Sequence, residues 1–293
     1  MRVGRCVVLF FLFALVARVF PQSTNNSPQS SECVWFVLAG GTREQMPLIP
    51  AFKVAGGKLY DVPIDCSDFD VPDTGYKKFE GEYFQPGRTF QVLFGGANAG
   101  TVVLNRADSE FGRGYGTYHG KAPIRGHISA LATLGKPKAK SASSRKPPTA
   151  AQQAAAIDLA KKLFTKAGVA PQLLSKIKIE NLTVSSFTPS PREKLLASFS
   201  IEDAEGNRHA VLFISDVQED GLDPEFSWVH VTKTEAAVEV MGFVDQADLF
   251  DDGREEIIVE ISYYENWQYI VLARTSRGDR WEKIFETGLL GCE

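Results

Sequence analysis

Short runs of β-branched and aromatic residues, separated by glycine or proline turns, recur along the first part of the chain and favour strands. The clearest runs are residues 34–38 (VWFVL), 89–94 (TFQVLF) and 100–104 (GTVVL). Glycine pairs such as Gly40-Gly41 and Gly95-Gly96 supply the positive φ angles that hairpin turns require. We therefore expect residues 32–134 to form an all-β domain, a small antiparallel barrel or sandwich.

Two glycine-rich stretches lie within this region. Residues 94–100 (FGGANAG) lack the Lys-Ser/Thr pair of a phosphate-binding loop, so we interpret them as a hairpin turn. Residues 112–120 (GRGYGTYHG) leave two interpretations. They form either a mobile loop that presents Tyr115, Tyr118 and His119 to a ligand, or a flexible surface turn with His119 in solvent.

Composition changes abruptly at residues 135–149 (GKPKAKSASSRKPPT), which are basic and rich in proline and serine. This stretch has no large apolar side chain to bury, and it predicts a solvated linker between two domains. An amphipathic helix is expected over residues 149–167, with Thr149 as N-cap and Gly168 as the stop.

Residues 150–293 therefore predict a domain built from that helix and an antiparallel sheet. A short turn or helix is expected at 172–177, and the connections after it are short and rich in Asp, Gly and Asn, which favours a meander. The expected strands are 197–201, 209–217, 227–232, 238–244, 257–264, 268–274 and 281–286. The predicted fold class is mainly β, of the α+β type.

Residues 1–23 have the layout of a secretory signal peptide, with Arg2 and Arg5 before an apolar run at 7–17. They predict a secreted or periplasmic protein, followed by a disordered leader at 24–31. An uncleaved N-terminal membrane anchor is the alternative, since Val19 and Phe20 lengthen the apolar segment. A membrane partner is expected only in that case.

Export makes a disulfide plausible among the cysteines that follow the signal. Cys33 and Cys66 both fall in the first predicted domain and enclose a loop that a cross-link would stabilise usefully. We predict this pairing, with Cys292 left over. Two buried free cysteines are the alternative.

An acidic loop with a glycine at its turn lies at residues 245–260 (DQADLFDDGREEIIVE). Residues 248–259 resemble the calcium loop of FG-GAP or VCBS-type repeats, in which acidic residues and a glycine turn precede an apolar strand. The resemblance implies Asp248, Asp252 and Glu256 as ligands of calcium, a cation that prefers several oxygens at close range. Phe250 departs from the pattern, so an acidic turn held by Asp-to-backbone hydrogen bonds remains the other interpretation.

The loop is followed by aromatic residues at a predicted hairpin, namely Tyr263, Tyr264, Trp267 and Tyr269. They predict either a contact surface for a protein, peptide or glycan, or packing in the core.

The low net charge and the absence of two catalytic motifs narrow the range of possible functions. A net charge of -4 gives no general attraction for nucleic acid. Neither a His-Glu-x-x-His nor a Gly-x-Ser-x-Gly motif is present, so no enzyme class is indicated. We expect an exported, non-enzymatic binding protein. The alternatives are a secreted hydrolase of carbohydrate or peptide and a structural envelope component held by its N-terminus.

Overall fold

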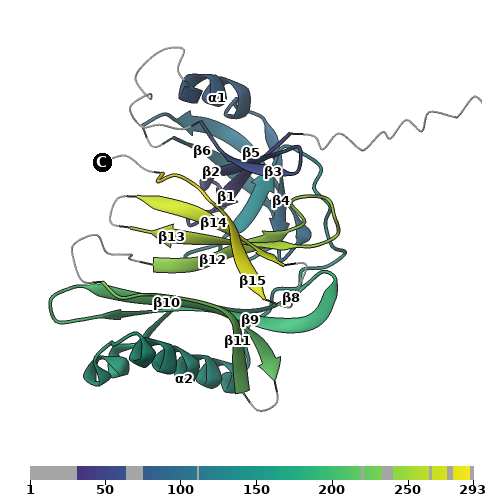
Figure 1. Cartoon of the computed structure of the whole chain (residues 1–293). Coiled ribbons are helices and arrows are strands. Elements are labelled where there is room, and N and C mark those ends of the chain that lie inside the picture. The colour runs from purple at the N-terminus through teal and green to yellow at the C-terminus, as the bar shows by residue number, and fades with distance from the viewer. Residues whose placement is uncertain are drawn as a thin grey trace, which may run out of the picture.

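Four layers stack on one another in the structure: a helix, two β-sheets and a β-barrel (Figure 1). The computed structural model describes residues 32–63, 75–110, 112–218, 221–232, 240–263, 266–275 and 280–290. The mainly-β class expected from the sequence is confirmed. The expected signal peptide at 1–23, the leader at 24–31, and Cys66, Cys292 and Tyr264 lie outside these residues.

The barrel is closed by six antiparallel strands in the order β1-β7-β4-β5-β6-β2, with β2 pairing back to β1. Its strands are β1 (Cys33–Leu38), β2 (Met46–Ala55), β4 (Thr89–Phe94), β5 (Ala97–Asp108), β6 (Arg113–Gly120) and β7 (Ala130–Thr133). A short strand β3 (Lys58–Asp61) pairs antiparallel with β2. Helix α1 (Gly75–Tyr83) places Phe79 against the interior rings of Phe36 and Phe84. Gly95-Gly96 forms the expected hairpin turn between β4 and β5.

Strand β6 corrects the expectation of a loop or surface turn at residues 112–120. Its inward-facing positions include Gly114, Gly116 and Tyr118, all buried. A Cβ on Gly114 would lie 2.6 Å from Leu104 Cδ1, and one on Gly116 would lie 2.6 Å from the carbonyl oxygen of Val103. Glycine therefore leaves room for the large side chains of a narrow barrel. His119 faces solvent, as one of the two interpretations expected.

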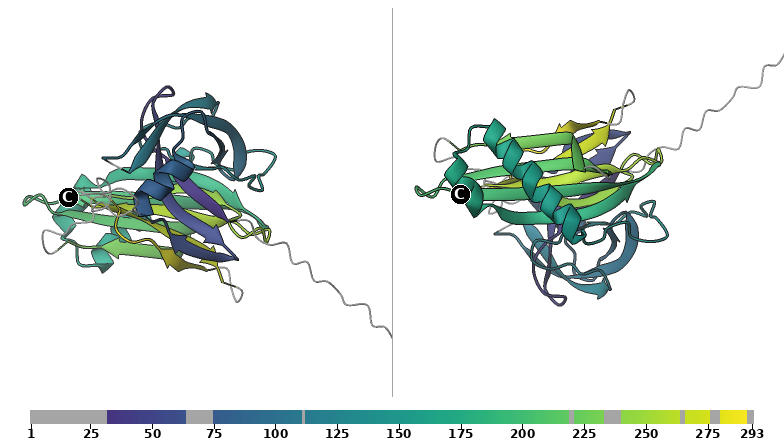
Figure 2. Two further views of the ribbon diagram at one scale, coloured as in Figure 1. Left: turned by 90° about the horizontal axis from the view of Figure 1, so that it is seen from above. Right: turned by 90° about the horizontal axis from the view of Figure 1, so that it is seen from below.

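Helix α2 (Ala150–Lys166) confirms the expected helix. Thr149 and Gln152 form a capping box at its start, and Ala156, Ala160 and Phe164 are buried beneath it. The 3-10 helix η2 (Pro171–Lys176) follows. Figure 2 shows α2 lying diagonally across the strands of the sheet that it covers.

Two four-stranded antiparallel meanders make up the middle layers. The first contains β8 (Lys178–Phe187), β9 (Ser190–Glu202), β10 (Arg208–Gln218) and β11 (Gly221–His230). The second contains β12 (Val240–Ala247), β13 (Glu256–Ser262), β14 (Trp267–Arg274) and β15 (Trp281–Glu286). The seven strands expected in this region all appear, and β8 is an additional one.

The second sheet is covered on both faces. Ile257, Val259 and Ile261 pack against the first sheet. Ile258 and Val271 on the other face pack against the barrel residues Trp35 and Phe52. A sheet buried on both faces must be apolar on both, which explains the nearly continuous apolar runs of β13 and β14. None of the helices that the structure describes is both long and apolar enough for a membrane span.

The inward-facing glycines of β6 give a first prediction. We expect Gly116→Ala to destabilise the protein by about 1–3 kcal/mol, because the added methyl group meets a backbone carbonyl that cannot move aside cheaply. Gly81→Ala, at an exposed position of α1 with open space around it, should be neutral or stabilising by about 0.5–1 kcal/mol. Urea unfolding curves measure both. Equal effects of the two variants would contradict the assigned role of Gly116.

Candidate functional site

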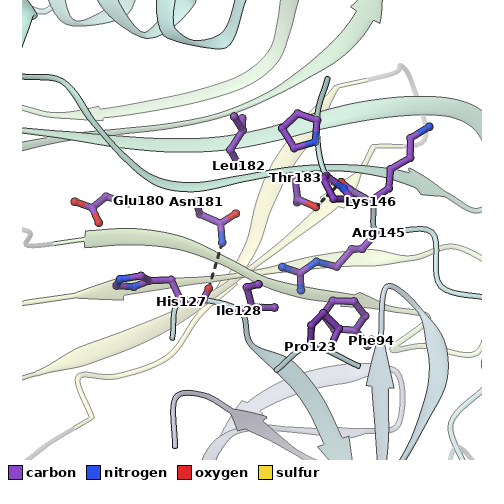
Figure 3. Close-up of a pocket in the computed structure, with 12 residues that line it drawn as sticks. Phe94, Pro123, His127, Ile128, Arg145, Lys146, Glu180, Asn181, Leu182 and Thr183 are labelled. Carbon is purple, nitrogen blue, oxygen red and sulfur yellow. Dashed lines mark hydrogen bonds between the residues drawn. The ribbon is translucent and has the colours of Figure 1, made fainter. Parts of the chain in front are cut away.

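A groove lies between the barrel and strand β8, at the edge of the first sheet (Figure 3). It consists of two adjoining cavities of about 300 and 100 Å³, which share His127, Glu180 and Asn181. We call them the apolar arm and the polar arm of the β8 groove. The apolar arm is lined mainly by Phe94, Pro123, Ile128, Pro147, Pro148 and Leu182. Residues of the polar arm include Ser129, Gly242 and Glu260.

The backbone of β8 explains why the groove is open. Lys146 exchanges two backbone hydrogen bonds with Val184, so residues 145–148 begin to run along the edge of the sheet. Pro147 and Pro148 follow, and proline has no N–H with which to continue the ladder. The edge of β8 before Val184 therefore faces the groove.

A β-bulge in β8 directs two polar side chains into the groove. The register between β8 and β9 shifts between Ile179 and Asn181. Bulges re-aim side chains, and here the neighbours Glu180 and Asn181 both line the groove although adjacent strand residues normally point to opposite faces.

Asn181 is 9% exposed and carries a buried acceptor without a partner. Its Nδ2 donates to the carbonyl oxygen of His127 at 3.4 Å, and this bond sets the orientation of the amide. Its Oδ1 has no hydrogen-bond partner among the described residues. Figure 3 shows this oxygen turned toward the middle of the groove. A buried acceptor left without a donor costs about 1–3 kcal/mol, which a ligand with a donor would recover.

The polar arm holds two carboxyl groups. Glu180 accepts hydrogen bonds on Oε1 from Ser200 Oγ at 2.6 Å, and the same oxygen lies 3.1 Å from Lys178 Nζ. Glu260 accepts from Ser262 Oγ at 2.9 Å. Burial raises the pKa of Glu260 above its ordinary value. A Cβ on Gly242 would meet nothing within 4 Å, so the cavity includes the space where a side chain would stand.

Arg145 forms the wall between the groove and the interior. Its Nη1 donates to the carbonyl oxygens of Ser129 and Val244 at 2.9 and 3.0 Å, and lies 3.9 Å from Asp245 Oδ1. The rings of Phe94 and Phe243 lie 4.5 and 4.7 Å from the guanidinium carbon. Burial lowers the pKa of Arg145, and its pairing with Asp245 opposes that effect.

Asp245 is completely buried. Both of its carboxyl oxygens accept from the backbone N–H of Gly95, at 2.8 and 3.1 Å. Burial raises the pKa of Asp245 to about 7, although Arg145 and these hydrogen bonds oppose the rise.

A second buried ion pair lies nearby. Lys140 Nζ is 2.6 Å from Glu255 Oε2 and donates to the carbonyl oxygen of Ser186 at 2.8 Å. Gln246 donates to Glu255 Oε1 and to the same Ser186 oxygen. We call Arg145, Asp245, Lys140, Glu255 and Gln246 the buried polar junction.

The junction includes Lys140 and Arg145 of the stretch 135–149, whose other residues are mostly exposed. Lys140 and Ser144 form backbone hydrogen bonds with Gly96 and Gly95 of the barrel, and the side chain of Arg145 is only 5% exposed. The stretch is therefore attached to the folded parts by a few hydrogen bonds and ion pairs, and its role as a linker stays a prediction. The division into two domains at this point stays a prediction.

The acidic loop forms a turn that is held by hydrogen bonds between its own residues. Asp248 accepts from the backbone N–H groups of Asp252 and Gly253, both at 3.0 Å, and Glu256 accepts from Leu249 at 2.9 Å. Lys138 Nζ lies 3.9 Å from Asp248 Oδ2. Burial, reinforced by Asp252 and Asp248, raises the pKa of Glu256 to about 8.

Calcium binding by these carboxyl groups stays a prediction. Within the described ranges, no three or more His, Cys, Asp or Glu side chains are grouped to hold a metal ion. The arrangement matches the alternative expectation of Asp-to-backbone hydrogen bonds. The likeness to FG-GAP repeats stays a prediction.

The predicted aromatic contact surface is wrong for Tyr269, which is 0% exposed and lies in the core between barrel and sheet. Tyr263 and Trp267 are half-buried and pack against core residues. Cys33 Sγ lies 2.9 Å from Thr133 Oγ1. Cys66 lies outside the described residues, so the Cys33–Cys66 disulfide stays a prediction.

Sequence reasoning did not single out Asn181, Glu180 or Glu260 as a site. Glu180 and Asn181 sit in a strand that was not expected, and their closeness to Glu260 depends on sheet packing. The sequence feature that bears on the groove is the pair Pro147-Pro148 directly after Arg145-Lys146, because prolines cannot continue a strand ladder. Comparisons of the chain with protein-family models, curated proteins and solved structures found no match.

The buried polar junction gives a second prediction. We expect Arg145→Met to destabilise the protein by about 3–5 kcal/mol, because Asp245 then lacks its buried counter-charge. The loss should shrink at acidic pH, where Asp245 is protonated, and Asp245→Asn in the same chain should recover part of it. Lys146→Met, which removes a largely exposed pair with Glu193, is the control and should cost less than about 1 kcal/mol. Denaturant unfolding at pH 5.5 and 8 measures these differences; no recovery by Asp245→Asn would contradict the assigned pairing.

The acidic loop gives a third prediction, on pH dependence. The raised pKa of Glu256 means that the folded protein keeps a proton that the unfolded chain releases near pH 4.5. The stability contributed by this group is therefore present below pH 4.5 and is lost as pH rises toward 8, by up to ~1.4 kcal/mol per pH unit. Glu256→Gln should remove this part of the decline between pH 5 and 8, as measured by thermal melts across pH. The exposed Glu282→Gln should keep the wild-type profile; an unchanged profile for Glu256→Gln would refute the assignment.

Proposed function

We propose that this is an exported binding protein that takes a small organic ligand in the β8 groove. The observation that carries the proposal is Asn181 Oδ1, a buried acceptor that is turned into the groove and has no donor within the described part of the chain. Protein structures rarely leave such an atom unbonded, and those that do call for an explanation such as a bound partner.

The size and lining of the groove support this proposal. The apolar arm, of about 300 Å³, lies at the lower end of the range of ligand pockets in proteins. Such pockets are lined mainly by apolar side chains and contain a few polar groups that orient the ligand. The apolar lining comes from residues such as Phe94, Ile128 and Leu182, and the polar groups come from Asn181 and Thr183. Export is supported by the layout of residues 1–23 alone.

A fourth prediction tests binding with 2-phenylethanol, whose ring fits the apolar arm and whose hydroxyl group can donate to Asn181. We expect saturable binding to the mature chain in ligand-observed NMR titrations, and at least a five-fold loss of affinity in Asn181→Leu. That loss corresponds to about 1 kcal/mol, as expected for one hydrogen bond.

Two glycine variants supply matched controls for this titration. Gly242→Leu adds a side chain inside the groove and should weaken binding. Gly288→Leu adds the same side chain at an exposed position with open space and should leave binding unchanged. Equal binding by wild type and both groove variants would refute the proposed site.

A secreted hydrolase is the second candidate. The observation in its favour is that His127, Glu180 and Glu260 line one cavity, and a carboxyl group with a raised pKa is typical of a general acid. Release of 4-nitrophenol from 4-nitrophenyl glycosides by the wild type, lost in Glu260→Gln, would favour this function over simple binding.

A further inference from the structure

We propose that the ligand of the β8 groove is a small organic cation, whose ammonium or guanidinium group enters the polar arm between Glu180 and Glu260. The inference rests on the proposed function and names its ligand class. An apolar body would occupy the neighbouring arm. Figure 3 shows the two ends of the apolar arm. Glu180 and His127, which it shares with the polar arm, lie at one end, and Phe94 and Pro123 lie at the other.

The side-chain groups that meet at the polar arm are mainly hydrogen-bond acceptors. They are the carboxyl groups of Glu180 and Glu260 and, where the two arms join, Oδ1 of Asn181. In each carboxyl group one oxygen takes a hydrogen bond from a serine, Ser200 or Ser262. The hydroxyl group of Tyr269 also faces Glu260, and it partly offsets the rise in pKa that burial causes in that carboxyl group. Acceptors of this kind are satisfied by a ligand that brings several donors, and an ammonium group brings three.

Arg145 and Lys146, two of the basic groups that line the groove, are already engaged. Arg145 donates to two carbonyl oxygens and faces Asp245. Lys146 pairs with Glu193, and Figure 3 shows its side chain directed away from the groove. Lys178 lies beside Glu180, but its side chain is 65% exposed, and exposed ion pairs contribute little. His127 stands at the exposed rim. The balance of charge in the polar arm therefore favours a cation.

The space over Gly242 suits such a group. The polar arm measures about 100 Å³, which is enough for an ammonium or guanidinium group with the carbon atoms next to it. A cation placed there would also lower the pKa of Glu260, which burial raises in the free protein.

The test compares three probes that share a phenyl ring: 2-phenylethylamine, 2-phenylethanol and 3-phenylpropionate. Calorimetric titrations of the full mature chain at pH 7.5 should show the amine binding at least ten-fold more tightly than the alcohol, and the carboxylate most weakly. Glu260→Gln should remove most of the preference for the amine while leaving the affinity for the alcohol within two-fold.

The control variants are Gly242→Leu, which should block the amine, and Gly288→Leu, which should not. If Glu260→Gln does not fold, as judged by its melting curve, Glu180→Gln carries the same test. Tightest binding of the carboxylate, or an unchanged preference in the folded glutamine variant, would overturn the cation proposal and leave the proposed function standing. Absence of binding by all three probes would overturn both.

Discussion

Burial of the Arg145–Asp245 pair is the constraint on which the rest of the structure depends. A charge taken out of water must be met by groups held in fixed positions. Here those groups come from the barrel turn at Gly95, from Ser129 near β7 and from Val244 in β12. Because the pair is satisfied only when these elements meet in one arrangement, it fixes the barrel against the sheets. The Lys140–Glu255 pair adds a second fixed point between residues 138–146 and the sheets.

The β8 groove follows from this arrangement. The chain leaves the buried polar junction through Lys146, pairs once with Val184, and then reaches two prolines that cannot extend the ladder. The bulge at Glu180 turns polar side chains toward the space that remains. Packing of the barrel over the second sheet brings Glu260 and Gly242 to the same place. The groove thus depends on contacts between parts of the chain that are far apart in sequence.

Strands with a strong local signal were predictable from sequence, and those shaped by their surroundings were not. The apolar runs of β1, β4, β10 and β13 predicted strands because their side chains suit a sheet wherever it packs. Strand β6 was not predicted because its three glycines, Gly114, Gly116 and Gly120, weaken the local preference for a strand, and packing in the barrel interior decides its conformation instead. Strand β8 was not predicted because Glu180, Asn181 and the serines after them are polar. Their burial is compensated by Ser200, His127 and Gln246, which lie elsewhere in the sequence.

The sequence by itself determined the fold class, the helix at residues 150–166 with its cap, most of the later strands and, as one of two interpretations, the acidic turn held by its own hydrogen bonds. These features depend on periodicity, turn chemistry and local hydrogen bonds, which act over a few residues. Tertiary structure decided that the Arg145 side chain of the basic stretch is buried, that Tyr269 is core, and that Glu180, Asn181 and Glu260 line one groove. Those outcomes depend on burial and on partners distant in the chain, and local pattern carries no information about either.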